Sequence, residues 1–544
     1  MVASLSDEHA HWTPPHAIRR VAVLGAGAAG MPMARHLNAA GIEVKIFERN
    51  PEVGGIWRYV DDKRPVPLMP STSRTKADYQ PDLLPVTVDL PHTEEEVFVN
   101  EPAAASSRAQ AMLLELAPPG PAYDSLKNNI PGPLMVFQDC PRRKGEPWYI
   151  THEEHQLYLM RYSESFGISD MTSFNTRVEK VDEIVDDHGH PAGWSVWTKK
   201  IEIVEKGARV AVQTTYDVET FDAVVCATGH HNAPATPDIP GLSEWQQTWP
   251  DRVSHAINFR RGEDFRGRRN VLIVGSGPSG SDMAREIEVY ADHVYVTTRP
   301  FETDDSPDTM IVKTVFRDRL VSDKCSLVPV VKRFLPPTPS SDSGQVEMAD
   351  GSVIEVDAVL FATGYFHSYP FLKDYESRRG TSESSRIHES QYTVLNLHLD
   401  LFHIPNPTLV LLGVPANISA FSFFEYHSLA VARVFSGAAQ LPSIRLMQLE
   451  YARRRASCSD RNLHVYGKVQ EPRVVREISA WLNDEALRLG KETQLRHIEP
   501  YSEEYLRVKS KTVEGLRMRD EQDSGRLTAK RLVYERELQQ VITA

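Results

Sequence analysis

The chain has 544 residues, which is enough for more than one domain, and its 41% hydrophobic and 25% charged residues are typical of a globular protein. A formal net charge of −13 without a large basic patch argues against nucleic-acid binding, and no run of about eighteen apolar residues predicts a membrane span. The first residues lack the apolar core of a signal peptide and the four cysteines form no CxxC pair. We therefore expect a cytoplasmic protein without a cysteine-based metal site or dithiol redox centre.

Residues 20–50 predict a strand, a glycine turn, a helix and a second strand. Gly25, Gly27 and Gly30 have GxGxxG spacing, in which the glycines permit a tight turn, close approach of a pyrophosphate and helix packing. Glu48 ends the second strand, where a carboxylate can accept a hydrogen bond from a ribose hydroxyl. The predicted dinucleotide contacts come from Gly25, Ala26, Gly27, Ala28, Ala29, Gly30, Glu48 and Arg49.

The segment that follows contains Gly54-Gly55-Ile56-Trp57, and we predict that Gly55, Ile56 and Trp57 pass close to the same cofactor. Residues 61–122 have no sustained hydrophobic period and predict an irregular insertion with a short helix at 107–116. A helix is expected over residues 152–166 and short strands over 174–225, which end in Ala-Thr-Gly.

A second unit of the same kind begins with a predicted strand at residues 270–274. At the position where the first unit has Glu48, this unit has Arg299, whose donors suit a 2′-phosphate that a carboxylate would repel. We predict FAD or NAD in the first unit and NADPH in the second, although Arg299 could also be an ordinary surface arginine. The predicted contacts of the second unit are Gly275, Gly277, Pro278, Ser279, Gly280, Thr298 and Arg299.

Beyond the second unit, residues 300–345 are polar and predict little regular structure. Another strand ends in Ala-Thr-Gly at 362–364, and together with the first such strand it indicates that the chain leaves one domain and later returns to it. The remaining chain predicts a strand at 408–413 and helices at 429–435 and 472–489, with Pro472 in the first turn of the last helix.

The order of five motifs, GAGAAG, GGIW, YDSLKNNIP, VGSGPSG and FATGY, resembles the class B flavin monooxygenases, specifically the flavin-containing group that oxygenates nitrogen and sulfur. The resemblance covers most of residues 20–440, and the late segment looks like fungal members. The family pattern FxGxxxHxxx(Y/F)(K/R) is retained at His255, Phe259 and Arg260, whereas Trp249 and Asp251 replace its Phe and Gly.

The resemblance implies an α/β fold with two Rossmann-like dinucleotide-binding domains, mostly parallel sheets and a helical C-terminal region. An FAD domain would comprise residues 1–255 and 353–544, with an NADPH domain inserted at 256–352. It also implies that NADPH reduces FAD, that oxygen forms a C4a-hydroperoxyflavin, and that an amine or sulfide of a small molecule, such as a secondary metabolite, is oxygenated. By this resemblance Asn129 is the catalytic asparagine over the flavin and Asn128 replaces a Thr or Ser beside the cofactor.

Several alternatives stay open at this stage. Phe259-Arg260 argues against Baeyer–Villiger oxygenation of ketones, and the absence of paired cysteines argues against a flavin disulfide reductase. An NADPH oxidase that does not oxygenate a substrate and a non-catalytic NADPH-binding regulator are further alternatives. The expected activity resembles that of an N,N-dimethylaniline monooxygenase. Neither the substrate nor the oligomeric state is predicted, and a homodimer is one of the open alternatives.

Overall fold

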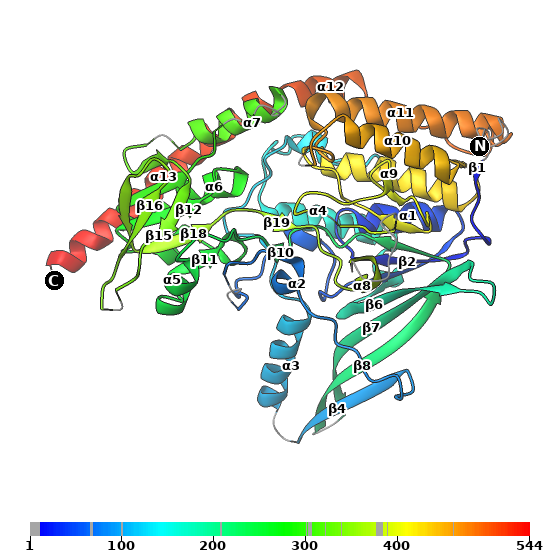
Figure 1. Cartoon of the computed structure of the whole chain (residues 1–544), viewed down its shortest axis with the longest axis horizontal. Coiled ribbons are helices and arrows are strands. Elements are labelled where there is room, and N and C mark those ends of the chain that lie inside the picture. Colours follow the sequence, from blue (N-terminus) through cyan, green and yellow to red (C-terminus); the bar gives the residue numbers. More distant parts are fainter. Residues whose placement is uncertain are drawn as a thin grey trace.

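The computed structural model describes residues 11–65, 69–99, 102–206, 209–300, 302, 307–320, 322–338, 340–376, 385–388, 390–460 and 462–543. Two lobes lie side by side, each built on a mostly parallel sheet, and a layer of helices covers the lobe that contains both the early and the late chain (Figure 1). The predicted α/β fold is thereby confirmed. Among the described residues, no helix combines the length and apolar character that a membrane crossing needs.

The first sheet has seven strands in the order β20-β21-β22-β9-β2-β3-β5. Its central pairs are parallel, and only β20 and β21 run antiparallel to their neighbours. The strands are β2 (Arg20–Leu24), β3 (Glu43–Phe47), β5 (Thr172–Ser173), β9 (Ala223–Cys226), β20 (Leu397–His398), β21 (Phe402–His403) and β22 (Leu409–Leu411).

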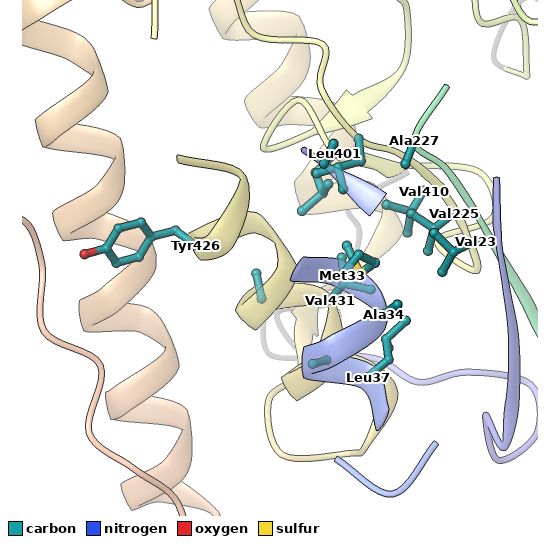
Figure 2. Close-up of a cluster of buried hydrophobic side chains, with 14 of the residues drawn as sticks. Val23, Met33, Ala34, Leu37, Val225, Ala227, Leu401, Val410, Tyr426 and Val431 are labelled. Atoms are coloured by element: carbon teal, nitrogen blue, oxygen red, sulfur yellow. The ribbon is translucent and has the colours of Figure 1, made fainter. Parts of the chain in front are cut away.

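Helix α1 (Gly30–Ala39) forms because its apolar residues recur at helical spacing on one face. Met33, Ala34 and Leu37 are fully buried and pack between the first sheet and α9 (Ala420–Phe435). Figure 2 shows these side chains beside Val23 of β2 and Val431 of α9. The helix that follows the glycine turn is therefore held on both sides by the largest core cluster.

The second sheet has five strands, all parallel, in the order β11-β18-β12-β13-β14. Helix α6 (Pro278–Ile287) follows β12. An antiparallel sheet of β15, β16 and β17 packs against the second sheet at β12. Two of the five strands, β11 and β18, lie outside residues 256–352, so the sheet extends past both predicted boundaries of the insertion. The strands are β11 (Val253–His255), β12 (Asn270–Val274), β13 (His293–Thr297), β14 (Cys325–Val328), β15 (Val331–Phe334), β16 (Gly344–Met348), β17 (Val353–Val356) and β18 (Ala358–Phe361).

Two chain crossings between the lobes are paired with each other. Strand β10 (Ala233–Pro234) follows β9 and runs antiparallel to β19 (Tyr365–Phe366), which follows β18. Each crossing comes directly after one of the Ala-Thr-Gly segments. These two crossings therefore form one two-stranded ribbon between the lobes, and the chain passes between them again from α12 (Glu503–Ser510) to α13 (Thr512–Thr543).

The prediction of a mostly irregular insertion at 61–122 is confirmed for the helix expected at 107–116, which is the second part of a longer helix, but it missed a strand and another short helix. This region contains α2 (Arg74–Ala77), β4 (His92–Val99) and α3 (Pro102–Leu116), and β4 is the edge strand of a sheet with β8 (Arg209–Phe221), β7 (Pro191–Lys206) and β6 (Thr176–Val185). Strand β4 pairs with residues more than a hundred positions later, and α3 packs through small residues such as Ala105 and Ala109. Neither feature produces a local hydrophobic period.

Residues 300–345 are also more regular than predicted, because α7 (Pro307–Asp318), β14, β15 and the start of β16 fall within them. The late helices are longer than predicted: α9 begins at Ala420, and α11 (Gly467–Arg488) begins five residues before Pro472, which lies inside the helix. The remaining elements are β1 (His11–Trp12), α4 (His152–Ser165), α5 (Leu242–Thr248), α8 (Lys373–Glu376), β23 (Leu441–Pro442), α10 (Ile444–Ala456), α12 (Glu503–Ser510) and α13 (Thr512–Thr543).

Candidate functional site

The first glycine turn is fixed by packing at two of its three glycines. Gly25 has φ +105°, and a Cβ there would lie 2.7 Å from the carbonyl oxygen of Ala227. A Cβ at Gly30 would lie 1.9 Å from the carbonyl oxygen of Gly25. At Gly27 a Cβ would meet only the Cα of Gly55, at 3.5 Å, which is an ordinary contact. The middle glycine is therefore not required by the packing of this turn, and its backbone faces open space.

A cavity of about 400 Å³ opens at this turn, at the carboxyl ends of β2, β3, β9 and β22. This is the edge at which parallel α/β sheets bind ligands. Of the residues predicted to contact the first dinucleotide, nine line the cavity: Gly25, Gly27, Ala28, Ala29, Glu48, Arg49, Gly55, Ile56 and Trp57. Ala26 and Gly30 do not line it, since Ala26 is buried behind the turn and Gly30 packs against Gly25.

Glu48 is buried at the wall of this cavity with its carboxylate already oriented. One oxygen accepts the backbone N–H of Ala26 at 2.7 Å, and the other accepts the backbone and side-chain N–H groups of Asn50 at 2.8 Å each. These bonds tie the glycine turn to the end of β3. Because each carboxylate oxygen has two acceptor sites, the group can still accept a hydrogen bond from a hydroxyl in the cavity.

The far wall of the cavity is apolar and aromatic. Phe421 of α9 lies edge-on to Trp57, with ring centroids 6.4 Å apart, and Trp57 stacks on His155 at 4.1 Å. Burial lowers the pKa of both His155 and the cavity residue His231 to about 3, so these rings are neutral at physiological pH. The cavity therefore combines polar groups at the glycine turn and charged side chains such as Asp78 and Arg177 with an aromatic wall, which suits a dinucleotide with a planar ring system.

Several lining residues of this cavity were not predicted from the sequence. They come from the start of β6, from the segment after β9 and from the segment after β22. Only the second of these carried a signal, the Ala-Thr-Gly end of its strand. The residues are Thr176, Arg177, Val178, Thr228, Gly229, His230, His231, Asn232, Leu412, Gly413, Pro415, Ala416, Asn417 and Ile418.

The second glycine turn repeats the geometry of the first in a more open setting. A Cβ at Gly275 would lie 2.5 Å from the carbonyl oxygen of Ala362, and one at Gly280 would lie 2.1 Å from that of Gly275. A Cβ at Gly277 would meet no atom within 4 Å. Gly277, Pro278 and Ser279 are exposed at the N-terminus of α6, where free backbone N–H groups favour an anion.

The end of β13 differs from the end of β3. The hydroxyl of Thr297 accepts the N–H of Gly275 at 3.0 Å, so it takes over the turn-fixing role that Glu48 has in the first unit. Thr298 is half-buried and donates its backbone N–H to Val328, and Arg299 is exposed. An exposed guanidinium next to an open glycine turn can approach a phosphate on a ligand bound there.

The prediction that Asn128 contacts a cofactor is wrong. Its side chain is buried and lies away from the cavity, where its amide donates to the carbonyl oxygens of Ile130 (2.6 Å) and Trp148 (2.7 Å) and accepts the N–H of Ile150 (2.7 Å). The side-chain amide of Asn128 forms its hydrogen bonds with backbone groups of the protein, and a sequence motif does not show such partners. Asn129 is half-buried, and no hydrogen bond to its side chain is found within the part of the chain that the structure describes.

The motif around His255 and Arg260 has a structural role in this chain. Arg260 is buried and donates to the carbonyl oxygens of Asp62, Ile257 and Phe259 at 2.8–3.1 Å, and burial lowers its pKa. His255 is fully buried, accepts the N–H of Ile257 at 3.1 Å, and has a pKa lowered by burial to about 3. The motif therefore fastens the insertion after the first unit to the start of the second sheet.

No metal centre accompanies these sites among the residues that the structure describes, since no group of three His, Cys, Asp or Glu side chains could hold an ion there. The four cysteines are free thiols, and burial raises the pKa of Cys325 to about 12.

A sequence model of the flavin-binding monooxygenase-like family matches residues 120–303 and 310–496, and one of an NAD(P)-binding Rossmann-like domain matches 23–88. Flavin-containing monooxygenase iboF of Amanita muscaria is 30% identical over 88% of this chain and 90% of its own length, and ustF2 of Aspergillus flavus is 31% identical over 79% and 85%. The S-allyl-L-cysteine S-oxygenase of Allium sativum superposes with a TM-score of 0.64 at 25% identity, over 95% of this chain and 99% of that one.

Proposed function

The chain belongs to the flavin-binding monooxygenase-like family and is a flavin monooxygenase that uses FAD and NADPH. On this premise we propose that it oxygenates an amine nitrogen or a sulfide of a small molecule. The supporting observation is the cavity at the first glycine turn, which joins a turn suited to a pyrophosphate to an aromatic wall. The S-oxygenase from Allium sativum carries such chemistry on a similar fold, which supports sulfides as the first substrates to test.

In this proposal the first unit holds FAD and the open second unit holds NADPH. The first assignment is supported by Glu48 at the cavity wall and by the open backbone at Gly27. The second is supported by Arg299, which is exposed next to the turn at Gly277. The division of the chain into an FAD domain and an inserted NADPH domain and the cytoplasmic localisation stay predictions.

Bound FAD would supply the redox chemistry, namely exchange of electrons with NADPH and with oxygen, while the chain would supply binding, orientation and exclusion of water. The aromatic rings of the far wall would pack against the ring system of the cofactor, while charged side chains such as Arg49, Asp78 and Arg177 also line the cavity. The substrate needs only a lone pair on nitrogen or sulfur that can reach the ring system, so loops around the cavity would determine specificity.

Asn129 is proposed to act after flavin reduction, by holding the coenzyme and the activated oxygen with an amide that both donates and accepts. The Asn129→Asp variant keeps the size of the side chain but replaces its donors with a carboxylate, which repels developing negative charge. We expect NADPH-driven flavin reduction to survive while the consumed NADPH is diverted to hydrogen peroxide. Stopped-flow reduction rates and a peroxide assay would measure both effects, with Asn38→Asp, an exposed change on α1, as the control.

A variant at Asn129 that couples NADPH to product as well as the parent would show that this residue is only part of a turn. The substrate proposal is tested separately by offering an amine, a sulfide and a ketone to the parent enzyme and detecting products that are heavier by one oxygen atom. N,N-dimethylaniline is a suitable amine probe. Oxygenation of the ketone alone would favour Baeyer–Villiger chemistry, and peroxide without any product would favour an NADPH oxidase.

A further inference from the structure

Helix α13 lies beyond the residues matched by the flavin-monooxygenase family model, which end at 496, so that match assigns it no role. It leaves the helical layer of the first lobe after α12 and runs along the second lobe (Figure 1). Leu516 packs against Val315 and Phe316 of α7, and Leu527 packs against Val289 and Tyr290 after α6. The helix is therefore packed onto the lobe that carries the second glycine turn.

Arg519 is the central polar contact of this helix and is only 2% exposed. One nitrogen of its guanidinium donates to the carbonyl oxygen of Asn128 at 3.2 Å, and another donates to Asp282 of α6 at 3.1 Å. A single side chain thus bridges the segment that contains Asn129 and the helix that follows the second glycine turn. A planar fork of donors makes such a two-sided bridge, which a lysine could not reproduce.

The same segment, residues 123–131, is tied to α6 and α13 at two further points. The hydroxyl of Tyr123 donates to Asp282 at 2.9 Å, and Lys127 pairs with Asp523 of α13 at 2.7 Å. Burial would raise the pKa of Asp282, but Arg519 and Arg319 beside it lower the pKa overall, so its carboxylate is ionised at physiological pH. The contacts therefore form a connected network and not a set of isolated surface pairs.

The hydrogen bond from Arg519 reaches the peptide group that joins Asn128 to Asn129. The carbonyl group of Asn128 and the nitrogen and Cα of Asn129 belong to one planar peptide unit. The buried amide of Asn128 fixes that residue from the side of Trp148 and Ile150, while Arg519 fixes its carbonyl from the opposite chain segment. The nitrogen and Cα of Asn129, from which its side chain leaves the backbone, are thereby held by α13 together with the amide of Asn128.

We propose that Arg519 is a positioning residue, through which α13 holds the peptide between Asn128 and Asn129 in a fixed orientation relative to the second glycine unit. The proposal rests on the function proposed above for its effect on oxygenation, but its structural part does not. Loss of Arg519 would let the segment move, so that Asn129 meets the coenzyme less often in the productive geometry. Flavin binding at the first glycine turn would be unaffected.

The test compares Arg519→Ala with Arg519→Lys and with the control Arg517→Ala, which removes an exposed arginine from the same helix. In the full-length flavin-loaded protein, hydrogen–deuterium exchange of peptides that cover residues 123–131 should become about tenfold faster in Arg519→Ala, less so in Arg519→Lys, and unchanged in Arg517→Ala. Flavin content should be the same in all four proteins. Unchanged exchange in Arg519→Ala would overturn the proposal.

A second measurement separates positioning from general stability. In Arg519→Ala the maximal rate of flavin reduction by NADPH should be retained, while the share of NADPH that ends as hydrogen peroxide rises severalfold. If Arg519→Ala does not fold, Arg519→Lys carries the test, because it keeps a buried positive charge. Faster exchange without a change in peroxide in either variant would overturn the link to Asn129. If the parent enzyme itself produces only peroxide, the proposed function fails, and the exchange experiment still decides the role of Arg519.

Discussion

The two glycine turns of this protein share one backbone design and differ in what surrounds it. In each turn the first and third glycines lie within 3 Å of a carbonyl oxygen, counted from the position a Cβ would occupy, while the middle glycine has room. The first turn lines a cavity of about 400 Å³, whereas residues 277–279 of the second turn are exposed. The comparison teaches that packing of the turn requires the first and third glycines, while the middle glycine leaves room for a ligand.

The residue after the second strand also separates the two units. Glu48 is buried and fixes its turn by accepting the N–H of Ala26, while in the second unit the hydroxyl of Thr297 performs that task and leaves Arg299 free to be exposed. A carboxylate at the wall of a cavity suits a permanently bound dinucleotide with free ribose hydroxyls. An exposed arginine beside an open turn suits a phosphorylated coenzyme that exchanges with solution.

The largest effect is expected from valine at the middle glycines, which tests whether the two turns bind different cofactors. Gly27→Val should give a folded but colourless protein, because its side chain enters the space that the FAD pyrophosphate would need, and little else opposes it. Gly277→Val should stay yellow and lose NADPH binding instead. Flavin absorbance, circular dichroism and NADPH titration would measure these outcomes. A yellow Gly27→Val protein with full flavin content would place FAD elsewhere.

Acid should destabilise the fold of the first lobe at a higher pH than that of the second lobe. Burial lowers the pKa of His155, His231 and His255 to about 3 and that of His398, His403 and His427 to about 4, and only His255 lies in the second sheet. Below the unfolded value of about 6.5 the unfolded chain binds protons that the folded chain cannot, so stability falls as pH falls from about 6.5 towards 4. Each such histidine contributes roughly 1.4 kcal/mol per pH unit in that window.

Thermal unfolding and flavin release between about pH 7 and pH 5 would follow this loss. His427→Leu, in the interior of α9, should reduce the pH dependence of unfolding by about one proton. A melting temperature that does not change across this range would mean that the buried histidines are not held neutral.

The smallest expected effect concerns the exposed arginine of the second unit. Arg299→Ala should weaken NADPH binding by about tenfold and leave NADH binding nearly unchanged, because only NADPH offers a 2′-phosphate to a charge-assisted bond. Arg269→Ala, an exposed change at the opposite end of the same sheet, is the control and should alter neither coenzyme. Equal weakening of both coenzymes by Arg299→Ala would remove this residue from the phosphate site.

The sequence predicted the parts of the site whose signals are local. The strand at Asn270–Val274 begins and ends where it was predicted, and nine residues predicted around the first turn line its cavity. What could not be predicted depends on distant segments: β4 pairs with β8, and Arg519 reaches Asn128 across almost four hundred residues. The side chain of Asn128 was misassigned for the same reason, because its partners Trp148 and Ile150 are not visible in its own motif.

The paired crossings β10 and β19 have a mechanical consequence. Two independent linkers would let one lobe swing in several directions, but strands that are hydrogen-bonded to each other must bend together. A displacement of Ala233–Pro234 is therefore passed on to Tyr365–Phe366, so these two crossings move as one unit. The passage from α12 to α13 is a further connection between the lobes, and there Arg519 joins the carbonyl oxygen of Asn128 to Asp282 of α6.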